Sequence, residues 1–213
     1  MNIDNLHKDW LTLAKNYFDS TAFIISVWNN MKKNYSSKKR YYHNFIHIHS
    51  LLEMAEENGD ELKDKDEVLF AIWFHDIVYN PSSKKNEEKS ADLAKSILKE
   101  NFKKELNINK IYDLIISTKK HQIILDEDND NAFLLDFDLS ILGSNWNVYE
   151  SYIKNIRKEY KIYPDFVYNL ARKKVLQHFL NRKQLYFTDK YQDLLEVKAR
   201  QNLAREIKLL SLK

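Results

Sequence analysis

Glycine and proline are almost absent from this chain, and this scarcity constrains the fold more than any other feature. Only two Gly and two Pro occur among 213 residues. Tight hairpin turns depend on glycine, so the composition disfavours an all-β fold and favours long helices. It also excludes the glycine-rich phosphate loops, because neither GxGxxG nor GxxxxGKS/T can be formed from Gly59 and Gly143 alone. We therefore predict an all-α protein.

Apolar residues recur at helical spacing along the whole chain. With 44% hydrophobic and 31% charged residues, a chain of this length can bury one sizeable core. The periodicity predicts a single domain over residues 1–213, built as a bundle of roughly nine or ten helices. The first two helices are expected within residues 4–34, with a break at the capping residues Asp19, Ser20 and Thr21.

Charge and cysteine content exclude several classes of function. The net charge is only +3, and the basic run Lys32–Arg40 is interpreted as a solvated loop, so no nucleic-acid polymer is expected as a partner. The absence of Cys excludes disulfides, thiolate nucleophiles and Cys-ligated zinc. The N-terminus lacks the pattern of a signal peptide, and no apolar run approaches the ~20 residues that span a bilayer. We expect a cytoplasmic protein without a membrane segment.

The segment Val68–Tyr79 is apolar on every side except at the adjacent pair His75 and Asp76. A helix that is apolar all round is a buried helix, and an unpaired buried carboxylate costs several kcal/mol. The sequence of this pair alone allows two explanations of how the buried carboxylate of Asp76 is compensated. A neutral His can be hydrogen-bonded to the Asp, or both side chains can hold a divalent cation.

Three further histidines occur within seven residues, at His43, His47 and His49. His43 and His47 stand four apart, so on a helix they would share a face and could address one site. His49 has Phe45 and other apolar neighbours and is interpreted as a core histidine. Spacing alone does not decide whether His47 or His49 is a ligand.

Two pairs of acids are further candidates. Glu87 and Glu88 lie in the first turn of a helix predicted over residues 86–101. There they either interact favourably with the helix dipole, or one of them acts on a metal-bound water. Asp136 and Asp138 lie on a helix predicted from Ala132 to Leu142 and point about 200° apart, so they cannot both face one ion. The helical neighbours of Asp138 are all apolar, so we expect Asp138 to face the core and Asp136 to support the site or cap a neighbouring group.

The acidic stretch 126–130 is interpreted as a solvated loop, since it lacks the glycine of an EF-hand.

Five local motifs resemble one known family. The chain reads YHNFIHI at 42–48, WFHDIVY at 73–79, NEEKSA at 86–91, DFDLSILG at 136–143 and RKKVLQHFLNR at 172–182. The order His, His-Asp, Asp resembles the HD superfamily of metal-dependent phosphohydrolases. The first motif is similar to the YHNxxH of the cyclic-nucleotide phosphodiesterases, and the set resembles a bacterial family of predicted HD phosphohydrolases. The motifs cover about residues 40–185, and the resemblance runs from about Arg40 to the C-terminus.

The resemblance implies a role for each matching residue. His47, His75, Asp76 and Asp138 would be the metal ligands, His43 the general acid for the leaving oxygen, and Glu87 or Glu88 would hold or deprotonate the attacking water. Candidates to bind the substrate phosphate are Lys119, His121, Arg172 and Arg182, with Arg172 and His121 preferred because they lie in shared motifs. The phosphodiesterases follow their HD with Asp-His, whereas Ile77 and Val78 follow here, and their base-reading glutamine is not identifiable.

These observations predict a metal-dependent phosphohydrolase that cleaves a phosphoester of a small molecule, with a nucleotide as the leading candidate. Imidazole and carboxylate without thiolate suit Mn²⁺, Fe²⁺, Zn²⁺ or Co²⁺, with Mg²⁺ at a second position bridged by Asp76. The alternative is a non-catalytic domain that uses the same metal site to bind a nucleotide or a phosphorylated signal. A purely structural helical module would leave the buried His75, Asp76 and Asp138 without a purpose.

Overall fold

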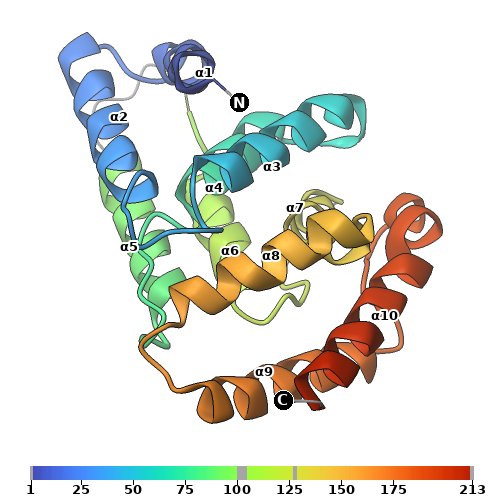
Figure 1. Cartoon of the computed structure of the whole chain (residues 1–213). Helices are drawn as coiled ribbons and strands as arrows, with labels where there is room; N and C mark the ends of the chain where they lie inside the picture. The colour runs from blue at the N-terminus through green and yellow to red at the C-terminus, as the bar shows by residue number, and fades with distance from the viewer. Residues whose placement is uncertain (1, 100–104, 127–128, 212–213) are drawn as a thin grey trace. The chain divides into compact units, whose positions relative to one another are not determined.

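The computed structural model of the chain describes residues 2–99, 105–126 and 129–211 (Figure 1). Over these ranges the chain forms ten α-helices and two short 3-10 helices, with no strand. The predicted all-α fold is confirmed. The helices are α1 Ile3–Lys15, α2 Thr21–Tyr35, α3 Phe45–Glu57, η1 Gly59–Glu61, α4 Lys65–Phe74, α5 Asn86–Leu98, α6 Ile108–Thr118, α7 Asp130–Leu139, η2 Ser140–Gly143, α8 Trp146–Glu159, α9 Asp165–Leu180 and α10 Asp189–Ser211. The predicted end of the fifth helix at Asn101 lies outside the described residues.

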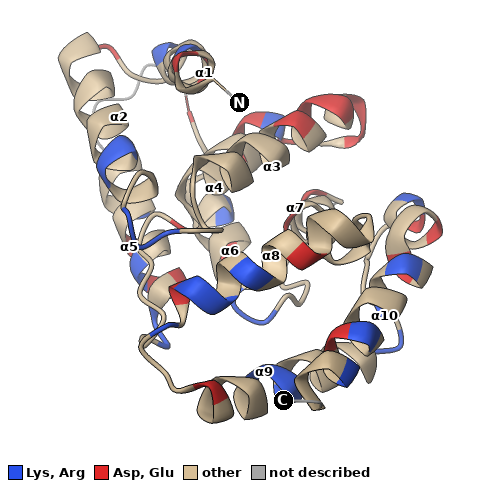
Figure 2. Ribbon diagram, viewed as in Figure 1, with Lys and Arg blue, Asp and Glu red and all other residues tan. Residues whose placement is uncertain are grey.

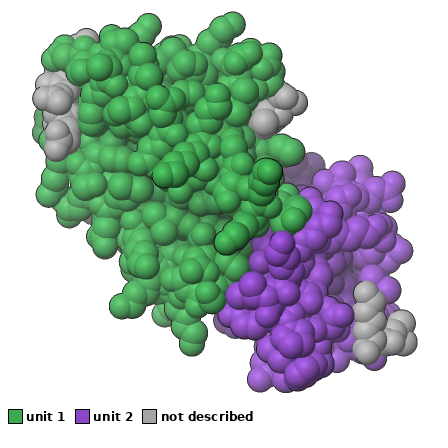
Figure 3. All heavy atoms as spheres, turned by 60° about the vertical axis from the view of Figure 1, so that its left-hand side comes forward, with its two compact units in different colours: residues 1–134 green, residues 135–213 purple. Residues whose placement is uncertain are grey.

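The chain divides into two compact units, residues 1–134 and residues 135–213 (Figure 3). The first unit holds α1 to α6 and the beginning of α7. The second unit holds the remainder of α7, the 3-10 helix η2 and α8 to α10. That all 213 residues form a single domain stays a prediction.

Helix α4 is the centre of the first unit and packs against α3, α5 and α6. A helix that is apolar on all sides needs a neighbour on each side, and α4 has them. Each large apolar side chain that it removes from water contributes about 1.5–3 kcal/mol to stability. The buried residues of α4 are Val68, Phe70, Ala71, Ile72, Trp73 and Phe74.

Helix α4 ends at Phe74, and His75 is its C-cap residue. The expectation that the helix continues to Tyr79 was therefore wrong. Side chains from elsewhere take up the backbone groups that follow: Arg40 donates hydrogen bonds to the carbonyl oxygens of Asp76 and Ile77. These contacts replace the hydrogen bonds that a further helical turn would have supplied.

Asp130 begins α7 and is fully buried. Its carboxylate accepts hydrogen bonds from the backbone N–H groups of Lys63 and Asp64 at 2.8 and 2.9 Å, just before α4 begins. It also forms an ion pair with the buried Lys110 at 2.6 Å. The interpretation of residues 126–130 as a solvated loop was therefore wrong for Asp130, which helps to fix the start of α4. Residues 127 and 128 of this stretch lie outside the described residues.

In the second unit, η2 packs against α8 and α10, and α9 packs against α10. Gly143 permits this close approach, because a Cβ atom at that position would lie 2.6 Å from Cβ of Leu195 on α10. The unit also buries an ion pair between Arg172 of α9 and Glu206 of α10, at 2.8 Å. Tyr149 of α8 donates a hydrogen bond to the same carboxylate, at 2.5 Å.

Basic and acidic residues both occur on the helices of each unit, and acidic residues gather at the end of α3 (Figure 2). This distribution is typical of solvated helix faces and not of a single basic patch. Among the described residues, no helix combines the length and the apolar character that crossing a bilayer requires.

Candidate metal centre

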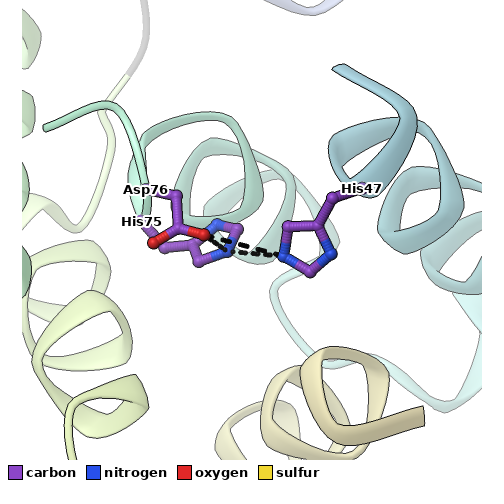
Figure 4. A group of neighbouring side chains, drawn as sticks. All are labelled: His47, His75 and Asp76. Carbon is purple, nitrogen blue, oxygen red and sulfur yellow. Dashed lines mark hydrogen bonds and ion pairs between the residues drawn. The ribbon is translucent and has the colours of Figure 1, made fainter. Parts of the chain in front are cut away.

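Three side chains of the first unit converge on one point (Figure 4). His47 lies in the first turn of α3, while His75 and Asp76 stand at the end of α4. The Nε2 atoms of His47 and His75 are 3.2 Å apart. Oδ2 of Asp76 lies 3.3 Å from Nε2 of His75 and 3.7 Å from Nε2 of His47. Both histidines are buried, and the side chain of Asp76 is 15% exposed.

These spacings match the edges of a coordination polyhedron. Two ligand atoms that each lie ~2.1 Å from one ion are ~3.0 Å apart at an angle of 90° and ~3.4 Å apart at the tetrahedral angle. The longest edge, 3.7 Å between His47 and Asp76, corresponds to ~120° by the same geometry. One divalent cation can therefore reach all three atoms without a change in their separation.

The tautomer of His75 is fixed by its surroundings. Its Nδ1 lies 2.9 Å from the carbonyl oxygen of Ile72, and a carbonyl can only accept a hydrogen bond. Nδ1 of His75 therefore carries the proton, and in the neutral ring Nε2 presents its lone pair towards His47 and Asp76. A backbone carbonyl that holds the distal nitrogen in this way is typical of metal-ligating histidines.

The environment of Asp76 favours its charged form. Burial by itself raises the pKa of this carboxyl, but the positive charge that His75, His43 and His47 carry when protonated, with a hydrogen bond from protonated His75, outweighs burial and holds the pKa well below its usual range. A carboxylate is the form that binds a cation. The group thus offers two imidazole nitrogens and one anionic oxygen, a set without thiolate.

His43 is a neighbour of these three residues but is not part of the group. It precedes Asn44, the N-cap residue of α3, so the expectation that His43 and His47 share a helix face was wrong. Its ring instead stacks on Tyr79, with centroids 4.3 Å apart and an interplanar angle of 28°. The ring centroids of His43 and His47 are 6.1 Å apart. The role of His43 as general acid stays a prediction, and its position next to the three ligands is compatible with that role.

His49 does not belong to the group of three ligands. Its side chain is 30% exposed and lies 3.5 Å from the carboxylate of Glu53, one turn further along α3. Its interpretation as a core histidine was therefore wrong. Of the two candidates that spacing left open, His47 is the one that joins His75 and Asp76.

Glu87 and Glu88 occupy the first turn of α5, as expected. Glu88 forms an ion pair with Lys119, the C-cap residue of α6, so two predicted site residues meet here. This contact lowers the pKa of Glu88. Neither glutamate belongs to the three-residue group, and their action on a water stays a prediction. His121 follows α6 in the left-handed region, with φ of 46°.

Asp136 and Asp138 both belong to the second unit, and their burial is the reverse of the expectation. Asp136 is fully buried, whereas Asp138 is only partly buried. The carboxylate of Asp136 accepts hydrogen bonds from the N–H groups of Phe187 and Thr188 and from the Thr188 hydroxyl, at 2.7, 2.8 and 2.7 Å. Burial nevertheless raises the pKa of Asp136 to about 6. Asp136 therefore caps a neighbouring turn, and the role of Asp138 as a metal ligand stays a prediction.

The two predicted phosphate-binding arginines also lie in the second unit. The guanidinium of Arg172 is engaged by both carboxylate oxygens of Glu206, at 2.8 and 3.1 Å, which neutralises its charge. Arg182 lies over the ring of Phe179, 4.6 Å from its centroid. Contact of either arginine with a phosphate stays a prediction, and Arg172 already has a structural partner.

Arg40 is the residue that the sequence did not reveal. It belongs to the basic run interpreted as a solvated loop, yet only 9% of its surface is exposed. Its guanidinium donates hydrogen bonds to the carbonyl oxygens of His43, Asp76 and Ile77, directly behind the candidate ligands. No local pattern distinguishes Arg40 from the lysines that precede it.

No protein-family model, curated protein or solved structure matches this chain. Membership of the HD superfamily therefore stays a prediction that rests on the five motifs. The group of His47, His75 and Asp76 can hold a metal ion on its geometry alone.

Proposed function

We propose that this chain is a divalent-metal-dependent hydrolase that cleaves a phosphoester of a small molecule, with a nucleotide as the leading substrate candidate. The observation that carries the proposal is the convergence of two buried imidazole nitrogens and a carboxylate oxygen at coordination spacing, 3.2–3.7 Å. The motif resemblance, in which the same three residues correspond to ligands, supports it further.

Each residue has a defined part in this chemistry. His47, His75 and Asp76 would hold the ion, and the donor set suits Mn²⁺, Fe²⁺, Zn²⁺ or Co²⁺. A divalent cation, when bound, supplies the Lewis acidity that activates water and screens charge on phosphorus. His43, whose ring lies beside the ligands, would give its proton to the leaving oxygen.

A metal-containing domain that binds a nucleotide or phosphorylated signal without turnover is the second candidate. The ion pair of Glu88 with Lys119 favours it, because it occupies a carboxylate that an enzyme would need to act on the water. The ring of His43 favours the enzyme, since a binding domain has no need of an acid.

Metal analysis followed by a substrate panel separates these possibilities. The purified wild-type chain should contain close to one equivalent of a divalent metal and, with added Mn²⁺, hydrolyse at least one of a set of nucleotides and phosphoesters. His75→Ala should lose both metal and turnover. His49→Ala is the matched control, because it removes an imidazole from α3 that lies outside the group.

Each failure has its own meaning. A wild-type chain that holds the metal and binds a nucleotide without hydrolysing any substrate would establish the second candidate. A chain that takes up no metal under any of these conditions would refute both.

A further inference from the structure

Arg40 connects two segments that carry the proposed chemistry. Its Nη1 atom donates hydrogen bonds to the carbonyl oxygens of His43 at 3.1 Å and Asp76 at 2.5 Å. Its Nη2 atom donates to the carbonyl oxygen of Ile77 at 2.7 Å. One side chain therefore ties the backbone at the proposed general acid to the backbone at a proposed ligand.

The end of α4 explains why a cation is suited to this place. The carbonyl oxygens of Asp76 and Ile77 follow the end of α4, where no further helical turn supplies donors, and the helix dipole makes this end negative. A buried guanidinium satisfies both requirements, since it supplies several donors and a delocalised positive charge. Because Arg40 comes from the segment before α3, it also fixes where that segment meets the end of α4.

Aromatic rings contact both the guanidinium of Arg40 and the imidazole of His43. The guanidinium carbon of Arg40 lies 5.0 Å from the ring centroid of Tyr35 and 5.5 Å from that of Tyr79. Tyr35 is itself anchored to α4 by a hydrogen bond from its hydroxyl to the carbonyl oxygen of Trp73. Tyr79 carries the stacked ring of His43. The backbone of His43 is thus held by Arg40 and its ring by Tyr79.

From these contacts we propose that Arg40 is a positioning residue, which fixes the backbone at the His75–Asp76 pair, and with it the geometry of the metal ligands, next to His43. The inference rests on the proposed function, because it takes His75 and Asp76 as metal ligands and His43 as the proton donor. The planar fork of arginine is essential to it. A lysine ammonium is a compact charge on a flexible stem and cannot hold three carbonyl oxygens while it stacks between aromatic rings.

Cobalt binding to the full-length chain tests this role without any need for turnover. The visible absorption of bound Co²⁺ reports the geometry of its ligands, and its titration gives the affinity. In Arg40→Lys and Arg40→Ala we expect a changed spectrum and ~10–100-fold weaker Co²⁺ binding, as when partners that orient metal ligands are removed. Added guanidinium, below denaturing concentrations, should restore part of the affinity of Arg40→Ala, and circular dichroism should show that both variants keep their helices.

Arg157→Lys is the matched control. Arg157 also donates hydrogen bonds to two backbone carbonyl oxygens, those of Tyr160 and Tyr163, and lies 4.7 Å from the ring centroid of Tyr168. It belongs to α8 in the second unit. Its replacement should leave the Co²⁺ spectrum and affinity unchanged.

The outcomes separate this inference from the proposed function. If the Arg40 variants keep the wild-type spectrum and affinity, Arg40 does not position the ligands, whatever substrates the wild type hydrolyses. Should Arg40→Ala fail to fold, Arg40→Lys decides alone, and wild-type behaviour in it overturns the inference. A wild type that binds Co²⁺ but hydrolyses nothing refutes the proposed enzyme. The role of Arg40 is then still decided by the Co²⁺ spectra and affinities of its variants. A wild type that binds neither Co²⁺ nor any other divalent metal overturns both.

Discussion

Replacing His75 with alanine should remove the stabilisation that a bound metal gives to the first unit. The substitution acts in two separable ways. It removes a buried imidazole that donates a hydrogen bond to the carbonyl oxygen of Ile72, and this cost is present with or without metal. It also deletes one of three converging ligand atoms, and this cost appears only when metal is present.

The two costs can be estimated. Leaving the Ile72 carbonyl unpaired, with the lost packing of the ring, should lower the free energy of unfolding by about 2–3 kcal/mol. A metal that binds only the folded chain stabilises the wild type by about 2.7 kcal/mol at 100 times its dissociation constant, and by about 4.1 kcal/mol at 1,000 times. The difference between wild type and His75→Ala should therefore grow from about 2–3 kcal/mol in chelator to roughly 5 kcal/mol at the lower metal concentration.

Urea unfolding followed by tryptophan fluorescence suits this measurement. Trp10, Trp28 and Trp73 lie in the first unit and only Trp146 in the second, so the signal reports mainly on the unit that holds the ligands. Wild type and His75→Ala are compared with chelator and with excess metal. Asp76→Asn serves as a second ligand variant of nearly unchanged volume, and His49→Ala should respond to metal like the wild type.

One result would refute the reasoning. If metal stabilises His75→Ala as much as it stabilises the wild type, the ion binds elsewhere, and the three side chains form only a hydrogen-bonded core group. A difference between the two proteins that is the same with chelator and with metal leads to the same conclusion.

Three further predictions concern residues of both units. Arg172→Met should cost about 3–5 kcal/mol of stability by urea unfolding, because it leaves the buried carboxylate of Glu206 without its cation, and the double variant Arg172→Met/Glu206→Met should recover most of the loss. His43→Ala should keep its metal by elemental analysis yet lose ~10²–10⁴-fold in kcat, with a smaller loss for nitrophenyl esters, whose leaving group needs little protonation. Asp136→Asn should lower stability by about 1–3 kcal/mol and keep most of the metal, whereas Asp138→Asn should lose metal and activity together; the reverse pattern would exchange their roles.

Helices were predictable because their signals are local. Ser20 was expected near the break between the first two helices, and its hydroxyl caps α2 by accepting a hydrogen bond from the N–H of Phe23. The apolar run that begins at Val68 was expected to be buried, and it forms the buried helix α4. In each case the determining contacts lie within about one turn of the residue itself.

Buried charges were not predictable, because their partners are distant in the sequence. Arg40 reaches carbonyl oxygens 36 and 37 residues away, and Asp130 reaches Lys63 across 67 residues. Both lie in runs of charge, which are solvated by default. The same cause reversed the expected burial of Asp136, although its expected capping of a neighbouring group is borne out. Its backbone donors lie 51 and 52 residues along the chain, out of reach of any count of helical neighbours.

The choice between His47 and His49 was, by contrast, available in the sequence. Residues two apart on a helix point about 200° apart, so only one of the two can face α4. The residues one and two turns after His47 are Leu51 and Ala55, both buried, whereas the residue one turn after His49 is Glu53, which is exposed and pairs with it. A face that continues with apolar residues is directed to the core, and a face that continues with an acid is directed to solvent. The residue at i+4 therefore favours His47 as the ligand. Of the apolar neighbours of His49, Ile46 at i−3 is exposed, and only Phe45 at i−4, in the first turn of the helix, is buried.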